Sequence, residues 1–376
     1  MVTRALFQMV CTSAMVFVTA CGPASPEVAA PVLPGTGGPA AIGPVAPGGS
    51  ASAAASATPA AKSAVGLDAP DNDPALVETA RAALACFGKP ECEAQGKWYE
   101  PFHRGRQVDV KTLVNFLEDE RPVIRRMGAA VLRGKKGQPG FHTDVGLSTR
   151  VLDALEREKD EQVARAIALA AGFIDARATG LEARMLKLMR SEPRERVRAQ
   201  LVGTVTDGNW DNATMVAAVK ELVNDASEEV RIEAVMALAV SELRAQACPF
   251  WLANLGHKDA HVADKSLFEM AHKGCKANYD AMIDAAEKRP PLSPENLGTL
   301  CSEGETPDGV KKKLVAATDK WAKDKALSGS QRVQALKVLA RCDPAQGKKA
   351  AAALVKDSDD YVREQAAEVE KTPAKR

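Results

Sequence analysis

A short phrase that recurs along the chain constrains its fold more than any other feature. Its clearest copy is Asp225-Ala-Ser-Glu-Glu-Val230-Arg231, in which an acid lies five residues before a β-branched anchor and a basic residue follows the anchor. The anchors are Ile124, Val163, Val197, Val230, Val262, Val333 and Val362, spaced 39, 34, 33, 32, 71 and 29 residues apart. A gap of 71 residues is about two periods, so we expect one drifted copy inside it. Self-similarity at this period predicts a helical solenoid.

The residues around the anchors resemble HEAT repeats over roughly residues 101–370. Position −5 is acidic or serine in six copies: Asp119, Glu158, Glu192, Asp225, Ser328 and Asp357. Position +1 is arginine in four copies: Arg125, Arg198, Arg231 and Arg363. Position −3 holds N-cap residue types: Asp160, Ser227, Asp259, Ser330 and Asp359. The resemblance implies an all-α, right-handed α-solenoid of about seven to eight helix pairs over residues 103–370, in which these acids and arginines cap helices and bridge neighbouring repeats.

Hydrophobic periodicity places a helix on each side of most repeat starts. We predict a helix at 250–255 that pairs with one at 260–272. The drifted copy begins with a helix at 279–287 and is interrupted by the proline-rich segment 289–294. Each pair is too thin to bury its own apolar face, so the anchors are predicted to be core residues.

The first 20 residues resemble a bacterial lipoprotein signal peptide. Arg4 precedes an apolar run at 9–18, and Val18-Thr19-Ala20-Cys21 resembles a lipobox with Cys21 at the cleavage point. The run is too short for a good transmembrane helix. The resemblance implies palmitate-type acylation of Cys21 and a lipid-anchored protein in the bacterial cell envelope, with the outer membrane as the expected location. A cleavable signal with an incidental cysteine is the alternative.

Residues 21–70 contain Gly, Pro, Ala and Ser with almost no charge. No apolar periodicity is present, which predicts a disordered tether that spans on the order of 40 Å; a removable pro-segment is the alternative. Residues 71–102 are predicted to form an N-terminal helix at 73–86 and an aromatic segment with Trp98, which either caps the open end of the solenoid or binds a ligand. Residues 371–376 are a C-terminal tail.

Six cysteines remain after Cys11 and Cys21, and an even number in an exported chain predicts disulfides. Cys86 and Cys92 flank a Gly/Pro turn. Cys248 and Cys275 lie at meeting ends of an antiparallel helix pair, and Cys301 and Cys342 end second helices of successive repeats. We therefore predict the pairs Cys86–Cys92, Cys248–Cys275 and Cys301–Cys342. No CxxC or CxxH spacing supports a metal site.

The sequence contains no catalytic constellation. His257 and His261 have i,i+4 spacing, but Lys258 stands where a zincin helix has glutamate, so a surface turn is favoured over a metal site. No Walker, GxGxxG, GxSxG or HExxH motif occurs. We predict no catalytic residue, no metal and no cofactor.

Opposed charges are hidden by the chain's net charge of +1, which gives no global attraction to nucleic acid. Residues 101–200 contain 20 Lys+Arg and 14 Asp+Glu, and residues 201–300 contain 9 and 15. Arg126, Arg165 and Arg194 lie in or beside second helices but outside the +1 position. HEAT-like stacking would place them on the concave side, where they would bind an acidic partner. A solvated surface whose charges cancel is the alternative.

Two functions remain compatible with these features. The HEAT resemblance implies a non-catalytic scaffold that binds an envelope protein or peptide. The alternative is an enzyme or lyase-like accessory that acts on a ligand bound in the concave face. The absence of site motifs favours the scaffold.

Overall fold

Helices make up the regular structure of the part of the chain that the computed structural model describes, namely residues 66–86, 89, 109–133, 141–288, 293–301 and 306–372. No strand occurs in these residues. Eight consecutive pairs form an all-α solenoid within them: α4 (Val110–Phe116) with α5 (Pro122–Arg133), α6 (Val145–Arg157) with α7 (Glu161–Ala171), α9 (Glu182–Ser191) with α10 (Glu195–Thr204), α12 (Ala213–Glu221) with α13 (Glu228–Ala237), α14 (Arg244–Asn254) with α15 (Ala260–His272), α16 (Tyr279–Lys288) with η5 (Pro294–Cys301), α17 (Asp308–Lys323) with α18 (Gly329–Cys342), and α19 (Pro344–Leu354) with α20 (Asp360–Lys371).

Further elements precede the pairs or connect them. They are η1 (Gly66–Asp68), α1 (Pro74–Cys86), α8 (Ala176–Thr179), α11 (Thr206–Asn209), η2 (Leu222–Asn224), η3 (Ser241–Leu243) and η4 (Lys276–Asn278). None of the helices in the described ranges is both long and apolar enough to cross a membrane.

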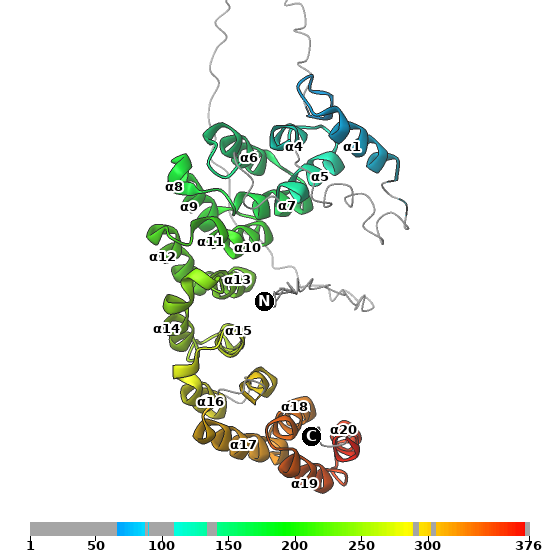
Figure 1. The fold of residues 1–376 in the computed structure, drawn as a ribbon, viewed down its shortest axis with the longest axis vertical. Helices are drawn as coiled ribbons and strands as arrows, with labels where there is room; N and C mark the ends of the chain where they lie inside the picture. The colour runs from blue at the N-terminus through cyan, green and yellow to red at the C-terminus, as the bar shows by residue number, and fades with distance from the viewer. Residues whose placement is uncertain are drawn as a thin grey trace, which may run out of the picture. The chain divides into compact units, whose positions relative to one another are not determined.

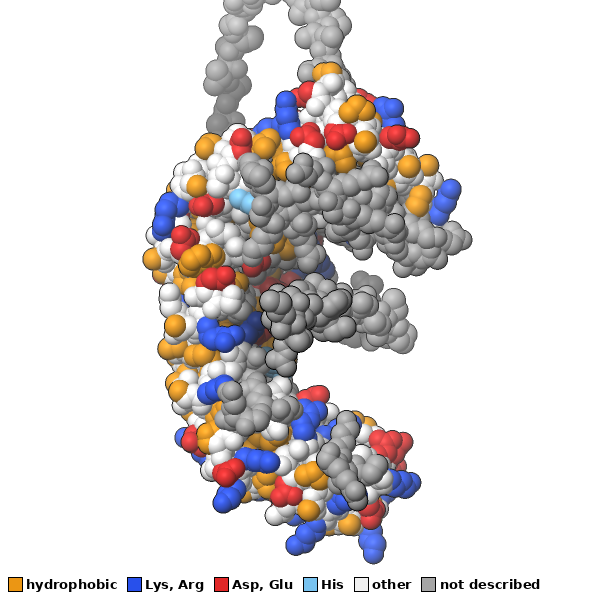
Figure 2. All heavy atoms as spheres, in the orientation of Figure 1, with side chains coloured by type: hydrophobic (Ala, Val, Ile, Leu, Met, Phe, Trp, Pro, Cys, Tyr) orange, Lys and Arg blue, Asp and Glu red, His pale blue; other side chains and the backbone are white. Residues whose placement is uncertain are grey.

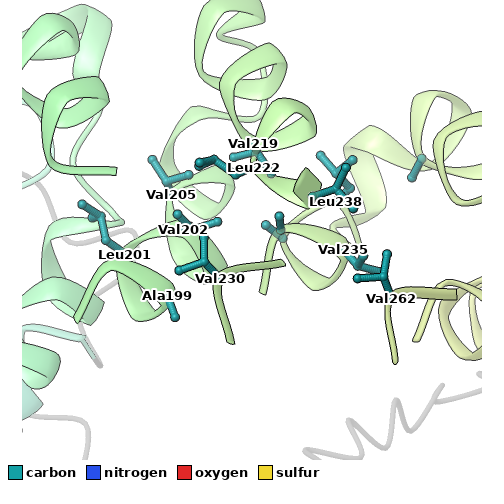
Figure 3. Close-up of a cluster of buried hydrophobic side chains, with 14 of the residues drawn as sticks. Ala199, Leu201, Val202, Val205, Val219, Leu222, Val230, Val235, Leu238 and Val262 are labelled. Carbon is teal, nitrogen blue, oxygen red and sulfur yellow. The ribbon is translucent and has the colours of Figure 1, made fainter. Parts of the chain in front are cut away.

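The second elements of the pairs pack on one another in sequence, and we call α5, α7, α10, α13, α15, η5, α18 and α20 the second-helix row. Figure 1 shows α5, α7, α10, α13 and α15 side by side, with α6, α9, α12 and α14 in a second row beside them. All seven anchors are buried in this row, with exposed fractions of 0–2%. Val230 lies among Ala199, Leu201 and Val202 of α10 (Figure 3), so the predicted register is confirmed.

Acidic and amide side chains begin many of these helices. The Asp160 carboxylate accepts hydrogen bonds from the backbone N–H groups of Gln162 and Val163, and Asp259 and Asp359 cap α15 and α20 in the same way. Ser227 is the N-cap residue of α13, as expected, but its side chain makes no cap hydrogen bond. One expected cap is wrong, because Ser330 lies inside α18 and Ser328 begins that helix with a capping box.

Two helices differ from the sequence prediction. Helix α14 begins at Arg244 and includes Pro249 as an interior residue. The helix therefore continues through this position although proline cannot donate the backbone hydrogen bond to the carbonyl four residues earlier. In the drifted copy, the 3-10 helix η5 takes the place of a regular second helix. Asp264 of α15 holds the start of η5 in place, because its carboxylate accepts hydrogen bonds from the Ser293 backbone N–H and the Asn296 side-chain amide.

Helical structure begins earlier in the chain than predicted. Residues 66–70 fall within the predicted tether, but Gly66–Asp68 forms η1 and Leu67 is only 1% exposed. The Leu67 backbone N–H donates to the Asp119 carboxylate at 2.8 Å, which ties η1 to the loop before α5. The signal peptide, Cys21, most of the tether and the aromatic segment at 97–102 lie outside the described residues.

Two of the predicted disulfides are present. Cys248–Cys275 joins α14 to the residue that follows α15, with Cα atoms 5.7 Å apart. Cys301–Cys342 joins the end of η5 to the end of α18, with Cα atoms 5.0 Å apart. Cys86 is also disulfide-bonded, but Cys92 lies outside the described residues, so the Cys86–Cys92 pair stays a prediction.

Candidate docking surface on the second-helix row

Ion pairs between successive repeats run along the starts of the second helices. Arg125 Nε of α5 lies 2.5 Å from Glu158 Oε2, which precedes α7, and the two side chains are 18% and 2% exposed. Arg198 Nη2 of α10 lies 2.9 Å from Asp225 Oδ1. Each arginine also donates to the backbone carbonyl of the −5 residue in its own copy. These +1 arginines therefore hold adjacent repeats together, as the HEAT resemblance implies.

The pairing changes register where a copy lacks the usual residue. Position −5 of the fifth copy is His257, so Arg231 Nε instead donates to Asp259 at 2.8 Å. Position +1 of the Val333 copy is Gln334, and Arg332 on the other side of the anchor reaches Asp357 at 3.1 Å. We call the four pairs the ion-pair ladder: Arg125–Glu158, Arg198–Asp225, Arg231–Asp259 and Arg332–Asp357.

Arg194, the third predicted docking arginine, already has partners within the array. Its Nε lies 2.6 Å from Glu192 Oε1, and its Nη1 donates to the Glu158 carbonyl at 2.6 Å. Arg121 makes the equivalent pair with Asp119 at 2.7 Å. An arginine at position −3 is thus close enough to bind the −5 acid of its own copy, so the Arg194 guanidinium already binds Glu192.

The acids of this network are held in their ionised form. Burial alone would raise the pKa of Glu158, but the Arg125 guanidinium and the backbone N–H groups of Asp160 and Lys159 outweigh it and lower that pKa. Burial would also raise the pKa of Glu192, but the hydrogen bonds and the charge of Arg194 outweigh burial and lower the pKa of Glu192. At Asp357 the hydrogen bonds from Arg332 lower the pKa from 3.8 to about 2.

Arg126 and Arg165 are the two predicted docking arginines that the ladder leaves available. Arg126 of α5 is half-buried and its Nη1 lies 3.3 Å from the Gln162 side-chain oxygen. Arg165 of α7 is exposed and lines a cavity of about 350 Å³ that lies on α7, α10 and α13. Both guanidinium groups lie on the second-helix row, as predicted.

The cavity itself was not predicted. Its wall consists of Arg165, Arg196, Ala199, Gln200, Glu228, Glu229, Ile232 and Glu233. Two pairs at its edge are already formed, since Arg196 Nε lies 3.4 Å from Glu229 Oε1 and His261 Nδ1 lies 2.5 Å from Glu228 Oε1. Positive and negative side chains thus meet here, which corrects the expectation of a surface with one sign of charge.

Glu233 is the unusual residue of the cavity. Burial raises the pKa of its half-buried carboxyl, and the charges of Lys265 and Arg165 offset this only in part. Its carboxylate lies against Gly203 of α10, where a Cβ would overlap it. The sequence carried a signal for Glu233, because it lies three residues after its anchor and the other copies hold Met127, Ala166, Gln200, Lys265, Leu336 and Gln365 there.

The histidines that suggested a metal site lie in other contacts. His257 Nε2 lies 3.3 Å from the Asn224 side-chain oxygen, and the ring of His272 stacks on Phe268 with centroids 3.9 Å apart. Among the described residues, no group of three or more His, Cys, Asp or Glu side chains is placed to hold a metal ion. Over the face drawn in Figure 2, described basic and acidic side chains are interspersed.

Comparison with known proteins adds a likeness to engineered repeat proteins. No protein-family model matches the sequence, and no curated protein matches it. An engineered protein of solved structure is 18% identical over 70% of this chain and 78% of that chain, with a TM-score of 0.35. A designed armadillo repeat protein is 16% identical over 70% of this chain and 99% of that chain, with a TM-score of 0.22. Scores this low carry no argument about function.

Proposed function

We propose that this chain is a lipid-anchored protein of the bacterial cell envelope that acts as a non-catalytic scaffold and binds another protein through its second-helix row. The observation that carries the proposal is that the arginines of this row fall into two groups. The ladder arginines bind acids of neighbouring repeats, whereas Arg126 and Arg165 lie on the same row outside the ladder. Two guanidinium groups on adjacent helices suit carboxylates on a partner.

The anchor is tested at Cys21. If the lipobox is used, Cys21→Ser leaves the full-length protein unprocessed or in the aqueous phase of a detergent partition, whereas the wild type enters the detergent phase. Inhibition of lipoprotein signal peptidase should block cleavage of the wild type. Wild-type protein that remains in the aqueous phase would contradict the anchor.

Docking is tested by charge reversal. Arg126→Glu with Arg165→Glu should weaken capture of the envelope partner and remove most of the salt dependence of capture, because electrostatic attraction across an interface is screened by salt. Arg177→Glu with Arg190→Glu is the matched control. It makes the same change in net charge at exposed arginines on α8 and α9, away from the second-helix row. Equal capture by both double variants at low salt would rule out this face.

A further inference from the structure

The cavity between α10 and α13 holds an acid that the described part of the chain leaves without a partner. Among the described residues, none donates a hydrogen bond to Glu233 or forms an ion pair with it, although four neighbouring groups influence or flank it. Arg165 of α7 and Lys265 of α15 act on its charge and Glu229 of α13 opposes it, while Arg196 of α10 is paired with Glu229. Lys265 is itself paired with Glu269 at 3.1 Å. Burial disfavours the ionised form of the Glu233 carboxyl, and an incoming cation would favour it.

The cavity wall has two chemical halves. Glu233, Glu228 and Glu229 lie along α13, and Ala199 and Ile232 supply apolar surface beside them. Lysine and arginine side chains combine an apolar stem with a charged end, so they cover apolar surface while the charged group binds an acid. The lining contains two arginines and three glutamates, which also favours a cationic over an anionic guest.

We propose that this cavity binds an arginine or lysine side chain of the partner protein, with the stem on Ala199 and Ile232 and the cationic group on the Glu233 carboxylate. The inference rests on the proposed scaffold function and specifies the partner's chemistry at one position. Together with Arg126 and Arg165, it describes a partner segment of mixed charge, with acidic side chains over α5 and α7 and a basic side chain at α13.

Gly203 is a positioning residue for this site. Because a Cβ at this position would overlap the far end of the Glu233 side chain, Gly203→Ala should push the carboxylate out of its place without changing any charge. The backbone of α10 need not move, since the overlapping group is the end of a flexible side chain.

Proton linkage gives the site a signature. Burial raises the pKa of Glu233, and a bound cation favours its ionised form. Affinity for a cationic guest should therefore rise as pH increases through this raised pKa, and binding within that window should release a proton. His261 also faces α13 through Glu228, so the linkage must be shown to depend on Glu233.

The test uses the full-length chain and two blocked pentapeptides of alanine, one with a central arginine and one with a central citrulline. Citrulline has nearly the same shape without the charge. Calorimetry in buffers of different ionisation enthalpy, from about pH 5 to 8, gives affinity and proton release. We expect the arginine peptide to bind at least about tenfold more tightly than the citrulline peptide near pH 7.5, a factor that a charged hydrogen bond readily supplies.

Variants of Glu233 and its surroundings complete the test. Glu233→Gln and Gly203→Ala should each remove most of the arginine preference, and Glu233→Gln should also abolish the pH dependence. Glu195→Gln is the control, because it removes one charge from α10 outside the cavity lining. It should change neither the arginine preference nor the pH dependence of binding. Equal binding of the two peptides, tighter binding of a central-glutamate peptide, or an unchanged arginine preference in a folded Glu233→Gln protein would overturn the proposal. If the protein prefers the arginine peptide but captures no envelope protein, only the scaffold function is overturned. If Glu233→Gln captures the envelope partner as well as the wild type does, only the proposed role of the cavity is overturned.

Discussion

Arg125 and Glu158 bind each other across the boundary between two repeats, 33 positions apart in the chain and with Nε and Oε2 separated by 2.5 Å. The Glu158 side chain is 2% exposed, and it also accepts hydrogen bonds from the backbone N–H groups of Lys159 and Asp160. The same carboxylate therefore organises the turn before α7 and holds α5 against it. Each ion pair of this kind joins two adjacent repeats, and similar pairs recur along the array.

Removal of Arg125 should therefore destabilise the array more than removal of an exposed arginine. Arg125→Ala leaves the Glu158 carboxylate buried without its guanidinium and should lower the free energy of unfolding by about 3 kcal/mol. Arg196→Ala is the control, because the Arg196–Glu229 pair is exposed and such pairs contribute about 0–1 kcal/mol. Urea denaturation of the full chain compares them. Similar losses in both variants would contradict the structural role of the buried pair.

Acid should weaken the fold through two carboxylates of the ion-pair ladder, Glu158 and Asp357, and through Glu192, which pairs with Arg194. The pKa values of Glu158 and Glu192 are lowered from 4.5, and that of Asp357 is lowered from 3.8 to about 2. A lowered pKa in the folded state contributes stability that is present above the ordinary pKa and is lost as pH falls through the folded pKa. The melting temperature should therefore change little from about pH 7 to 5.5 on account of these groups and should fall steeply below about pH 4.5.

Glu158→Gln provides the check on that assignment. This variant should be less stable than the wild type at pH 7 and should lose less stability on acidification, because one of the shifted carboxyl groups no longer titrates. Melting curves recorded by circular dichroism over the same pH series give both quantities. Parallel acid dependence in the variant and the wild type would mean that Glu158 does not contribute to acid unfolding.

A charge at an anchor should disrupt more than one repeat. Val230 of α13 is fully buried against α10, so Val230→Asp places an unpaired carboxylate in the core and should cost at least about 3 kcal/mol. Met236→Asp is the control on the same helix, since Met236 is 38% exposed. Hydrogen exchange should quicken in α10, α13 and α15 of the first variant only. Wild-type exchange rates in Val230→Asp would show that the register is wrong.

The Cys301–Cys342 disulfide should stabilise the repeat that contains η5. It closes a separation of 41 residues, and Cys301→Ala with Cys342→Ala should cost about 2–4 kcal/mol by freeing the unfolded chain. Hydrogen exchange should show the loss mainly in η5 and α18. Reduced wild-type protein is the control for the alanine substitutions, and a double variant as stable as the oxidised protein would remove any structural role for this cross-link.

Much of the fold could be predicted from the repeated phrase, because the structure of each repeat depends mainly on interactions between residues that are close in the sequence. The period, the buried anchors and the Asp160, Asp259 and Asp359 caps depend on residues within a few positions of one another. The disulfides Cys248–Cys275 and Cys301–Cys342 could also be predicted, since antiparallel pairs bring known helix ends together. The helix boundaries were less accurate at Pro249, which α14 includes. They were also less accurate at η5, whose start is held by Asp264 of a neighbouring helix.

The candidate site depended on tertiary structure to a greater extent. Sequence alone placed Arg126 and Arg165 on the second-helix row, but it could not show that Arg194 reaches Glu192 and the Glu158 carbonyl. The pairing of Arg332 with Asp357 in place of Gln334 was equally invisible. Nor could it show that Gly203 makes room for the Glu233 carboxylate on a neighbouring helix. The recurring local spacing in the sequence determined which residues lie in the core and which begin helices. Packing between repeats decided which charged side chains form ion pairs within the array and which lie outside those pairs.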